Sequence, residues 1–335
     1  TCYMLPPERS RGAVHLNQRG HYVLAGPVSH ILPIGGGKGG SGKTFITGSL
    51  GILLAKQGYT TLLIDVDFGT ANLHTILGIP HPERSISDFV NKRVESLQET
   101  IVPTSVSHLY FISGAMNNLD IANLAHEQKM RILRNIAKLP YEYVLLDLGA
   151  GTSFNTIDFF MISSHGIFVT TPEPTSVENI YRLVRSVYFR KVRQLFKAHE
   201  FRMLVEEAQK QHSRANVSNP DFLLRTVKEM NPDSGAMLER KLGEFRFKLV
   251  LNQLRKQDDP QIGALICKII ERHLFLKMDF IGNVSFDDNV HSAVCRNIPF
   301  LDLYPYTQAA FDLRECCKNL LSLREAHSAL QSAGD

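Results

Sequence analysis

Short apolar segments alternate with longer amphipathic segments along most of the chain. Four segments show helical periodicity, namely Thr44–Gln57, His126–Leu139, Thr175–Phe196 and Gln261–Leu274. Seven apolar segments end near Gly, Pro, Asp or Asn and are typical of strands: Val28–Ile34, Thr60–Val66, His108–Ser113, Tyr143–Leu148, Gly166–Thr171, Phe247–Leu254 and Asp279–Ser285. Because parallel strands need crossover helices, this order predicts an α/β fold, a doubly wound and mainly parallel sheet of about seven or eight strands flanked by helices.

Two regions interrupt the alternation. Residues 1–27 contain Pro6, Pro7 and two Arg-Gly pairs, and we expect a loosely structured leader there. Residues 197–244 are longer than a crossover requires and are mostly helical in pattern. We therefore expect residues 28–335 to form a single domain that carries a helical insertion at about 197–244.

The positive charge of the chain is concentrated around this insertion. The 335 residues carry a net charge of only +4, too little to identify the whole chain as a nucleic-acid-binding protein. The segment from Arg182 to Arg246, however, contains 14 Lys and Arg residues and only 8 Asp and Glu residues. Two interpretations remain open: an ordinary solvated helical face, or a docking surface for a partner or an anionic polymer.

Cysteine spacing and hydropathy exclude several classes of protein. The five cysteines include no C-x-x-C pair, which argues against zinc, redox and iron–sulfur sites and favours reduced thiols. The apolar runs are strand-sized and interrupted by charges or glycines, so none is expected to span a bilayer. We expect a cytoplasmic protein.

The strongest chemical signal is the segment GGGKGGSGKT at Gly35–Thr44, which contains the pattern G-x-x-x-x-G-K-[ST]. A predicted strand precedes it and a predicted helix follows, so backbone N–H groups and the helix N-terminus converge on a phosphate. The Lys43 side chain can reach the outer phosphates, and the Thr44 hydroxyl can bind Mg²⁺. The residues expected to contact nucleotide in this loop are Gly37, Gly39, Gly40, Ser41, Gly42, Lys43 and Thr44.

An additional lysine, Lys38, precedes the loop motif in the form KGG-x-GK-[ST]. This form resembles the deviant Walker A motif of the MinD/ParA ATPases, P-loop NTPases of the SIMIBI class. The resemblance implies ATP or ADP and Mg²⁺ as cofactors and an ATP-dependent homodimer. In that dimer Lys38 would reach the nucleotide of the partner and act catalytically together with Lys43.

The resemblance extends to both switch segments and to the adenine pocket. The family's D-x-D-x-G-x-x-N switch corresponds to Asp65–Asn72, which implies that Asp67 orients the attacking water and that Asp65 supports the magnesium shell. Asp147 ends an apolar run before Gly149 and Gly151, as in a Walker B strand, and would hold Mg²⁺ through water. Asn252 would read the adenine edge. The predicted metal residues are Thr44, Asp65 and Asp147.

Within the family, the segments ANLHTILGI, DLGAGTSFNTIDFF and TPEPTSVENIYRLV look like a MinD-like subgroup near the FlhG/FleN type. Phe45 stands where many relatives have a second Thr or Ser, so only backbone donors of Phe45 are expected to serve the phosphate. The flagellar partner-binding motif DQAxxLR is not matched by Leu16–Gly20. The last helical pattern resembles the family's closing helix rather than an interfacial membrane anchor.

The resemblance implies an ATP-dependent dimerising switch, a slow Mg-dependent ATPase stimulated by an unknown protein partner, that positions or regulates a cellular structure. The basic insertion leaves nucleic acid and membrane open as anionic surfaces, with recruitment to membrane or nucleoid. The alternative is a nucleotide-bound scaffold with negligible hydrolysis that acts through the insertion.

Overall fold

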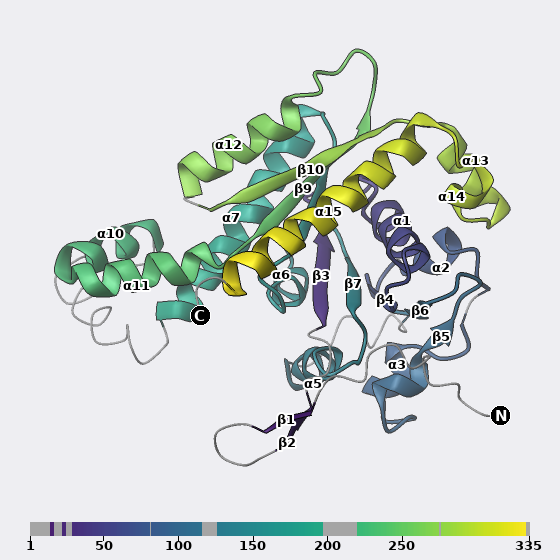
Figure 1. Cartoon of the computed structure of the whole chain (residues 1–335), viewed down its shortest axis with the longest axis horizontal. Coiled ribbons are helices and arrows are strands. Elements are labelled where there is room, and N and C mark those ends of the chain that lie inside the picture. Colours follow the sequence, from purple (N-terminus) through teal and green to yellow (C-terminus); the bar gives the residue numbers. More distant parts are fainter. Residues whose placement is uncertain are drawn as a thin grey trace.

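The computed structural model describes residues 14–16, 22–24, 29–80, 82–115, 126–196, 220–274 and 276–332 (Figure 1). Most of the predicted leader, residues 1–27, and the first half of the predicted insertion, residues 197–219, lie outside the described residues. Within the leader, β1 (Val14–Leu16) and β2 (Tyr22–Leu24) pair antiparallel.

An eight-stranded sheet forms the centre of the molecule, and all neighbouring strands except β5 and β6 are parallel. The strands lie in the order β10 (Met278–Ser285), β9 (Phe247–Leu254), β8 (Ile167–Thr170), β3 (His30–Gly35), β7 (Tyr143–Leu148), β4 (Thr61–Val66), β6 (Leu109–Ile112) and β5 (Val102–Pro103). The predicted mainly parallel α/β fold is confirmed. The sequence pattern did not predict β5, because two residues are too few to show a period.

Helices cover both faces of the sheet (Figure 1). One face carries α1 (Lys43–Lys56), α2 (Leu73–Ile76), α13 (Asn289–Arg296), α14 (Phe300–Leu303) and α15 (Gln308–Ser332). The other carries α3 (Ile86–Val90), the 3-10 helix η1 (Leu97–Thr100), α5 (His126–Ile136), α6 (Phe154–Phe160), α7 (Pro174–Phe196), α10 (Pro220–Met230), α11 (Pro232–Gly243) and α12 (Ile262–Leu274). No described helix is long and apolar enough to cross a membrane.

The period of two along the strands decides which core each side chain enters. In β7, Leu146 belongs to the core under α5–α7, whereas Leu145 belongs to the core under α1 and α15. In β4, Leu63 lies in the same α1-side core. Asp65 and Asp147 follow Leu63 and Leu145 at an interval of two, so both carboxylates point toward the α1 side of the sheet.

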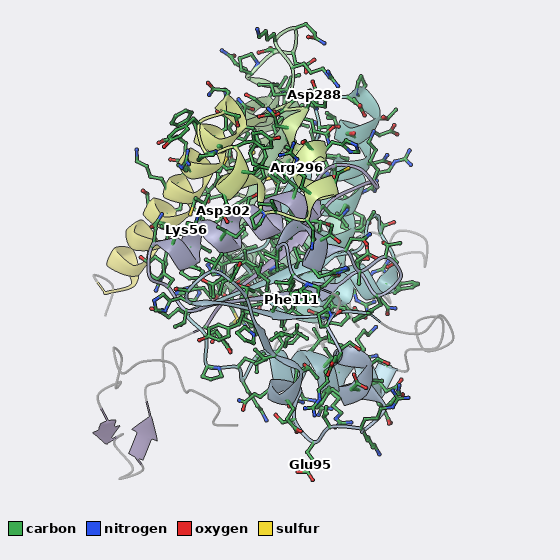
Figure 2. All side chains as sticks on the ribbon, turned by 90° about the vertical axis from the view of Figure 1, so that its right-hand side faces the viewer. Lys56, Glu95, Phe111, Asp288, Arg296 and Asp302 are labelled. Carbon is green, nitrogen blue, oxygen red and sulfur yellow. The ribbon has the colours of Figure 1, made fainter. Side chains whose placement is uncertain are left out.

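Helix α1 is buried on almost all sides, with Ile46, Leu50 and Leu54 at most 1% exposed. A helix that is apolar all round is stable only inside a core, and α1 lies between the sheet and α15. At its exposed end, the Nζ atom of Lys56 lies 2.6 Å from Oδ1 of Asp302. The two residues are labelled next to each other in Figure 2. Burial between the sheet and α15 therefore holds in place the helix that begins at the phosphate-binding loop.

Phe160 at the end of α6 allows the packing of the core under α5–α7 to be tested. Its ring is fully buried and stacks on Phe168 at 4.4 Å between centroids. We predict that Phe160→Ala lowers the free energy of unfolding by about 3–5 kcal/mol, because it leaves a cavity among packed rings. Phe154, 76% exposed at the start of the same helix, provides the control. Urea unfolding should give a loss below about 1 kcal/mol for Phe154→Ala. Equal losses for both variants would contradict the assigned packing.

Candidate nucleotide-binding site

The glycine-rich loop lies between the end of β3 and the start of α1, at the edge where β3, β4 and β7 all end (Figure 1). Helix α1 begins at Lys43, and the preceding Gly42 has φ 84°, in the left-handed region that glycine adopts without strain. The first N–H groups of α1 have no intrahelical partner and point out of the helix end. This geometry provides donors and a partial positive charge for an anion.

Close packing against the loop fixes its path. A Cβ atom at Gly42 would lie 2.0 Å from Nδ2 of Asn252, and one at Gly37 would lie 2.4 Å from the backbone of Asn179. Asn252 donates from Nδ2 to the carbonyl oxygen of Ser41 at 2.9 Å, and Gln253 donates from Nε2 to that of Gly40 at 2.8 Å. The end of β9 therefore holds the loop in place from one side.

Two polar groups of the loop are buried without a protein partner that would explain them. The Ser41 side chain is 1% exposed, and its hydroxyl has no hydrogen-bond partner among the described residues. Lys43 is 7% exposed, and no ion pair found in the described part of the chain includes it. Buried donors of this kind require an acceptor, and a phosphate group fits both.

Asp147 lies at the centre of the site, at the end of β7. Its carboxylate accepts a hydrogen bond from the hydroxyl of Thr47 at 3.2 Å, and the hydroxyl of Thr44 is near enough to lower the pKa of Asp147. Burial raises the pKa of Asp147 to about 6, although the two hydroxyls and the charge of Lys43 oppose the shift. A carboxylate with a raised pKa next to a loop for phosphates fits a cation that would stabilise its ionised form.

Asp65 lies beside Asp147, because the two residues are directly paired in the register of β4 and β7. Its carboxylate accepts hydrogen bonds from the backbone N–H groups of Asp67 at 3.0 Å and Leu73 at 3.1 Å. Burial and the neighbouring Asp147 raise the pKa of Asp65. Asp65 therefore also organises the segment that carries Asp67.

The two predicted switch segments lie against each other beside the phosphate-binding loop. A Cβ atom on Gly149 would lie 3.4 Å from Oδ1 of Asp67, so the segment after β4 faces the segment after β7. The N–H group of Gly151 donates to the carbonyl oxygen of Gly36 at 3.0 Å. The predicted second switch is thereby bonded directly to the phosphate-binding loop.

The described residues include no group of three or more His, Cys, Asp and Glu side chains that could hold a metal ion alone. Mg²⁺ binds proteins through one or two ligands and takes its other oxygens from water and phosphates. The residues present, Thr44 and Asp147 with Asp65 behind them, fit such an ion.

Lys38 lies outside this group. It is partly exposed near the tip of the loop, and its Nζ atom forms an ion pair with the carboxylate of Glu173, just before α7. This contact lowers the pKa of Glu173. Gly39 and Gly40 are exposed beside Lys38. The predicted loop residues are thus divided into a buried phosphate cradle and an exposed tip.

The structure adds three residues that the sequence pattern did not identify: Thr47, Glu173 and Gln253. Only Thr47 could have been found from the sequence, because it lies one helical turn after Lys43. Its hydroxyl donates to the carbonyl oxygen of Lys43 at 2.9 Å. Phe45 packs its ring against Phe300 in the core, at 5.4 Å between centroids, so only its backbone could face a nucleotide. Asn252 is 3% exposed and is engaged with the loop, and its contact with adenine stays a prediction.

Comparison with known proteins gives a consistent result. Residues 32–300 match the CobQ/CobB/MinD/ParA nucleotide binding domain family. The chain is 22% identical over 283 residues to the antiactivator FleN of Pseudomonas aeruginosa, covering 84% of this chain and 82% of that protein. It is 28% identical over 155 residues to the septum site-determining protein MinD of Helicobacter pylori, covering 46% of this chain and 57% of that protein.

Two solved structures illustrate the shared fold. MinD of Pyrococcus horikoshii complexed with Mg-ADP matches with a TM-score of 0.60 at 18% identity, covering 88% of this chain and 97% of that one. A ParA family ATPase from Chlorobium tepidum matches with a TM-score of 0.58 at 15% identity, covering 87% of this chain and 98% of that one. At these identities the likeness establishes the fold.

Replacement of Asp147 tests the buried carboxylate. Because the pKa of Asp147 is raised in the folded state, the ionised carboxylate destabilises the protein above that pKa. We predict that Asp147→Asn stabilises the nucleotide-free protein in EDTA at pH 7.5 by about 1–3 kcal/mol. The wild type should lose stability relative to the variant as pH rises from about 4 to about 6. With Mg-ADP bound, the wild type should instead be more stable than Asp147→Asn. Urea unfolding at several pH values measures both effects, and a pH-independent difference would refute the assignment.

Proposed function

The chain belongs to the CobQ/CobB/MinD/ParA nucleotide-binding family, and on that premise we propose that it is a Mg-dependent ATPase that dimerises when it holds ATP and resets on hydrolysis. As a member of the MinD/ParA group it shares the fold of ATPases. The dimer, the switch cycle and the action on a cellular structure through an activating partner are parts of the proposal.

The observation that carries the proposal is that the two switch segments lie against each other and that the second of them is hydrogen-bonded to the phosphate-binding loop. Asp67 faces Gly149, and Gly151 is hydrogen-bonded to Gly36. A γ-phosphate held between these segments would order both of them, and its loss would release both. A site built only to retain a nucleotide would not need this convergence.

Each residue of the site then has a defined task. Lys43 neutralises charge on the outer phosphates from the buried side of the loop, and the N–H groups at the start of α1 bind the phosphate oxygens. Thr44 and Asp147 would hold Mg²⁺, which supplies charge neutralisation at the phosphate oxygens. Asp65 holds the backbone of Asp67 in position, and Asp67 orients the attacking water.

Lys38 is proposed to act on the nucleotide of the partner in the dimer. In the monomer it forms an ion pair with Glu173 on the exposed side of the loop, away from Lys43. Its position at the tip allows it to exchange this carboxylate for a phosphate of a second copy, because an exposed ion pair contributes little to stability.

A scaffold with negligible hydrolysis is a second candidate, favoured by the helical hairpin formed by α10 and α11. Helix α10 contacts both α11 and α7, beyond the covering that the sheet requires. The two helices of the hairpin carry four basic and four acidic residues, so the basic surplus between Arg182 and Arg246 lies before them, on the second half of α7 and in the sequence that follows it. Under either candidate we propose α7 and the insertion after it as the surface for an anionic partner, with nucleic acid and membrane both open. Cytoplasmic residence with recruitment to such a surface is part of the same proposal.

The dimer is tested with Asp67→Ala, a variant expected to bind ATP but not to hydrolyse it. Light scattering should show twice the monomer mass with Mg-ATP and the monomer mass with Mg-ADP. Parallel samples with DNA or anionic vesicles test the surface. A monomer in both nucleotide states, with nucleotide binding verified separately, would reject the dimerising switch and favour the scaffold.

The lysine at the tip of the loop is tested with Lys38→Ala. We predict nearly unchanged affinity for Mg-ADP, but ATP-dependent dimerisation or turnover reduced by about tenfold or more, because the side chain acts between subunits. Lys56→Ala is a matched control, since Lys56 also forms an exposed ion pair, at the end of α1 away from the loop. If Lys38→Ala retains wild-type dimerisation and turnover, Lys38 has no role between subunits.

A further inference from the structure

A cavity of about 400 Å³ lies at the edge of the sheet opposite to the phosphate-binding loop. Its walls are the first residues of β3 and β7, Lys248 near the start of β9, residues 162–165 before β8, and the last part of α15 from Leu320 to Arg324. Because these strand ends face away from the loop, the cavity is separate from the nucleotide site.

The cavity exists because β8 is short. β3 pairs with β8 only through Ile34 and Gly35, so the edge of residues 30–33 that faces away from β7 has no neighbouring strand in the described part of the chain. The segment before β8 instead follows β9. The carbonyl oxygen of Ser164 accepts the backbone N–H of Arg246, just before β9, and that of Gly166 accepts the backbone N–H of Lys248 in β9, both at 2.9 Å. The gap between β3 and β9 leaves backbone polar groups that need partners.

A buried lysine lines this gap. The Lys248 side chain is 4% exposed, and its Nζ atom donates to the carbonyl oxygen of Arg246 at 3.1 Å. Burial lowers the pKa of Lys248 to about 8, while Asp279 on the adjacent strand opposes the shift, so Lys248 remains charged at pH 7. No ion pair found among the described residues includes Lys248. A buried cation with unused N–H donors is costly without an anion.

A second cation enters from α15. Nη1 of Arg324 donates to the hydroxyl of Tyr143 at 2.6 Å, and the guanidinium lies 5.1 Å from the ring centroid of Tyr143 and 5.8 Å from that of Tyr59. These contacts orient the guanidinium at the cavity wall. Four of its five N–H donors remain for other partners.

Lys248 and Arg324 line the same cavity as His30. The pKa of His30 is lowered to about 4 by burial and by the charges of Arg324 and Lys248, with Glu142 acting in the opposite direction. The Glu142 carboxylate is engaged elsewhere, because it accepts hydrogen bonds from the backbone N–H and the hydroxyl of Thr60 at 2.8 and 3.0 Å. The cavity therefore has a positive wall with a neutral imidazole.

The remaining wall is partly polar and partly apolar. Its polar part is formed by Ser29 and by residues 163–165, and its apolar part by branched aliphatic side chains from β3, from the segment after α6 and from α15: Ile31, Leu32, Ile162, Leu320 and Leu323. A volume of about 400 Å³ is within the range of small-molecule sites, which combine apolar walls with a few fixed polar groups.

We propose that this cavity binds a small amphiphilic organic anion. Its carboxylate or phosphate group is held by Lys248 and Arg324, and its hydrocarbon part packs against Leu320 and Leu323. Both headgroups are negatively charged and accept hydrogen bonds from a guanidinium. The two sources are distinguished by the probes below.

Isothermal titration calorimetry of the full chain with hexanoate, hexyl phosphate and 1-hexanol tests the proposal. At least one anion should bind about tenfold or more tightly than hexanol, because charged hydrogen bonds add to the apolar contact. The tighter anion identifies the headgroup. Native mass spectrometry of the starting sample shows whether a ligand was carried through purification, and an organic anion released from the wild type but not from Lys248→Met would itself support the site.

Two variants locate the binding. Lys248→Met and Arg324→Gln should each weaken the anion about tenfold or more, while hexanol binding stays unchanged. Lys256→Met removes an exposed lysine in the loop after β9 and should leave anion binding unchanged. Thermal unfolding verifies that each variant is folded. Equal affinity for hexanol and both anions, unchanged anion affinity in both cavity variants, or no binding by a ligand-free sample up to about 10 mM would overturn the proposal.

Discussion

The burial of two neighbouring carboxylates, Asp65 and Asp147, is the constraint on which the rest of the nucleotide site depends. They are paired in adjacent parallel strands and point to the same face of the sheet. Burial raises the pKa of both carboxyl groups. Because the two groups are neighbours, each also disfavours the ionisation of the other. Removing charge from water is expensive unless it is compensated. The surrounding structure supplies part of that compensation.

The compensating groups are also the functional groups. Asp147 accepts a hydrogen bond from Thr47 and is stabilised by the nearby Thr44 hydroxyl and the charge of Lys43, and Asp65 accepts the backbone N–H groups of the segment that follows β4. The groups that make the buried charges tolerable thus also position Asp67 and the start of α1. A magnesium ion bound with a nucleotide would supply the remaining positive charge. Ligand binding and the relief of unfavourable burial are in this way the same event.

At the opposite edge of the sheet the buried charge is positive rather than negative. There Lys248 is buried at the gap left by the short strand β8, and Arg324 approaches it from α15. A parallel sheet has two edges at which strands end, and in this protein one carries two buried carboxylates and the other a buried lysine and a half-buried arginine. Six residues of β3 separate the two sites. The buried charge at each site favours a ligand of the opposite sign.

The sequence by itself determined the strand and helix alternation, the phosphate-binding loop at Gly35–Thr44, and the aspartates at the ends of two strands. These features are local: period, glycine spacing and residue type within about ten positions state them fully. It did not determine which partners complete the site. Thr47 meets Asp147 across 100 residues, Lys38 meets Glu173 across 135, and Asn252 meets Ser41 across 211. Nor did it show that β8 stops short and leaves a cationic cavity. Strand order and register decide these contacts, because they bring distant segments together, and one sequence carries no local signal of such pairings.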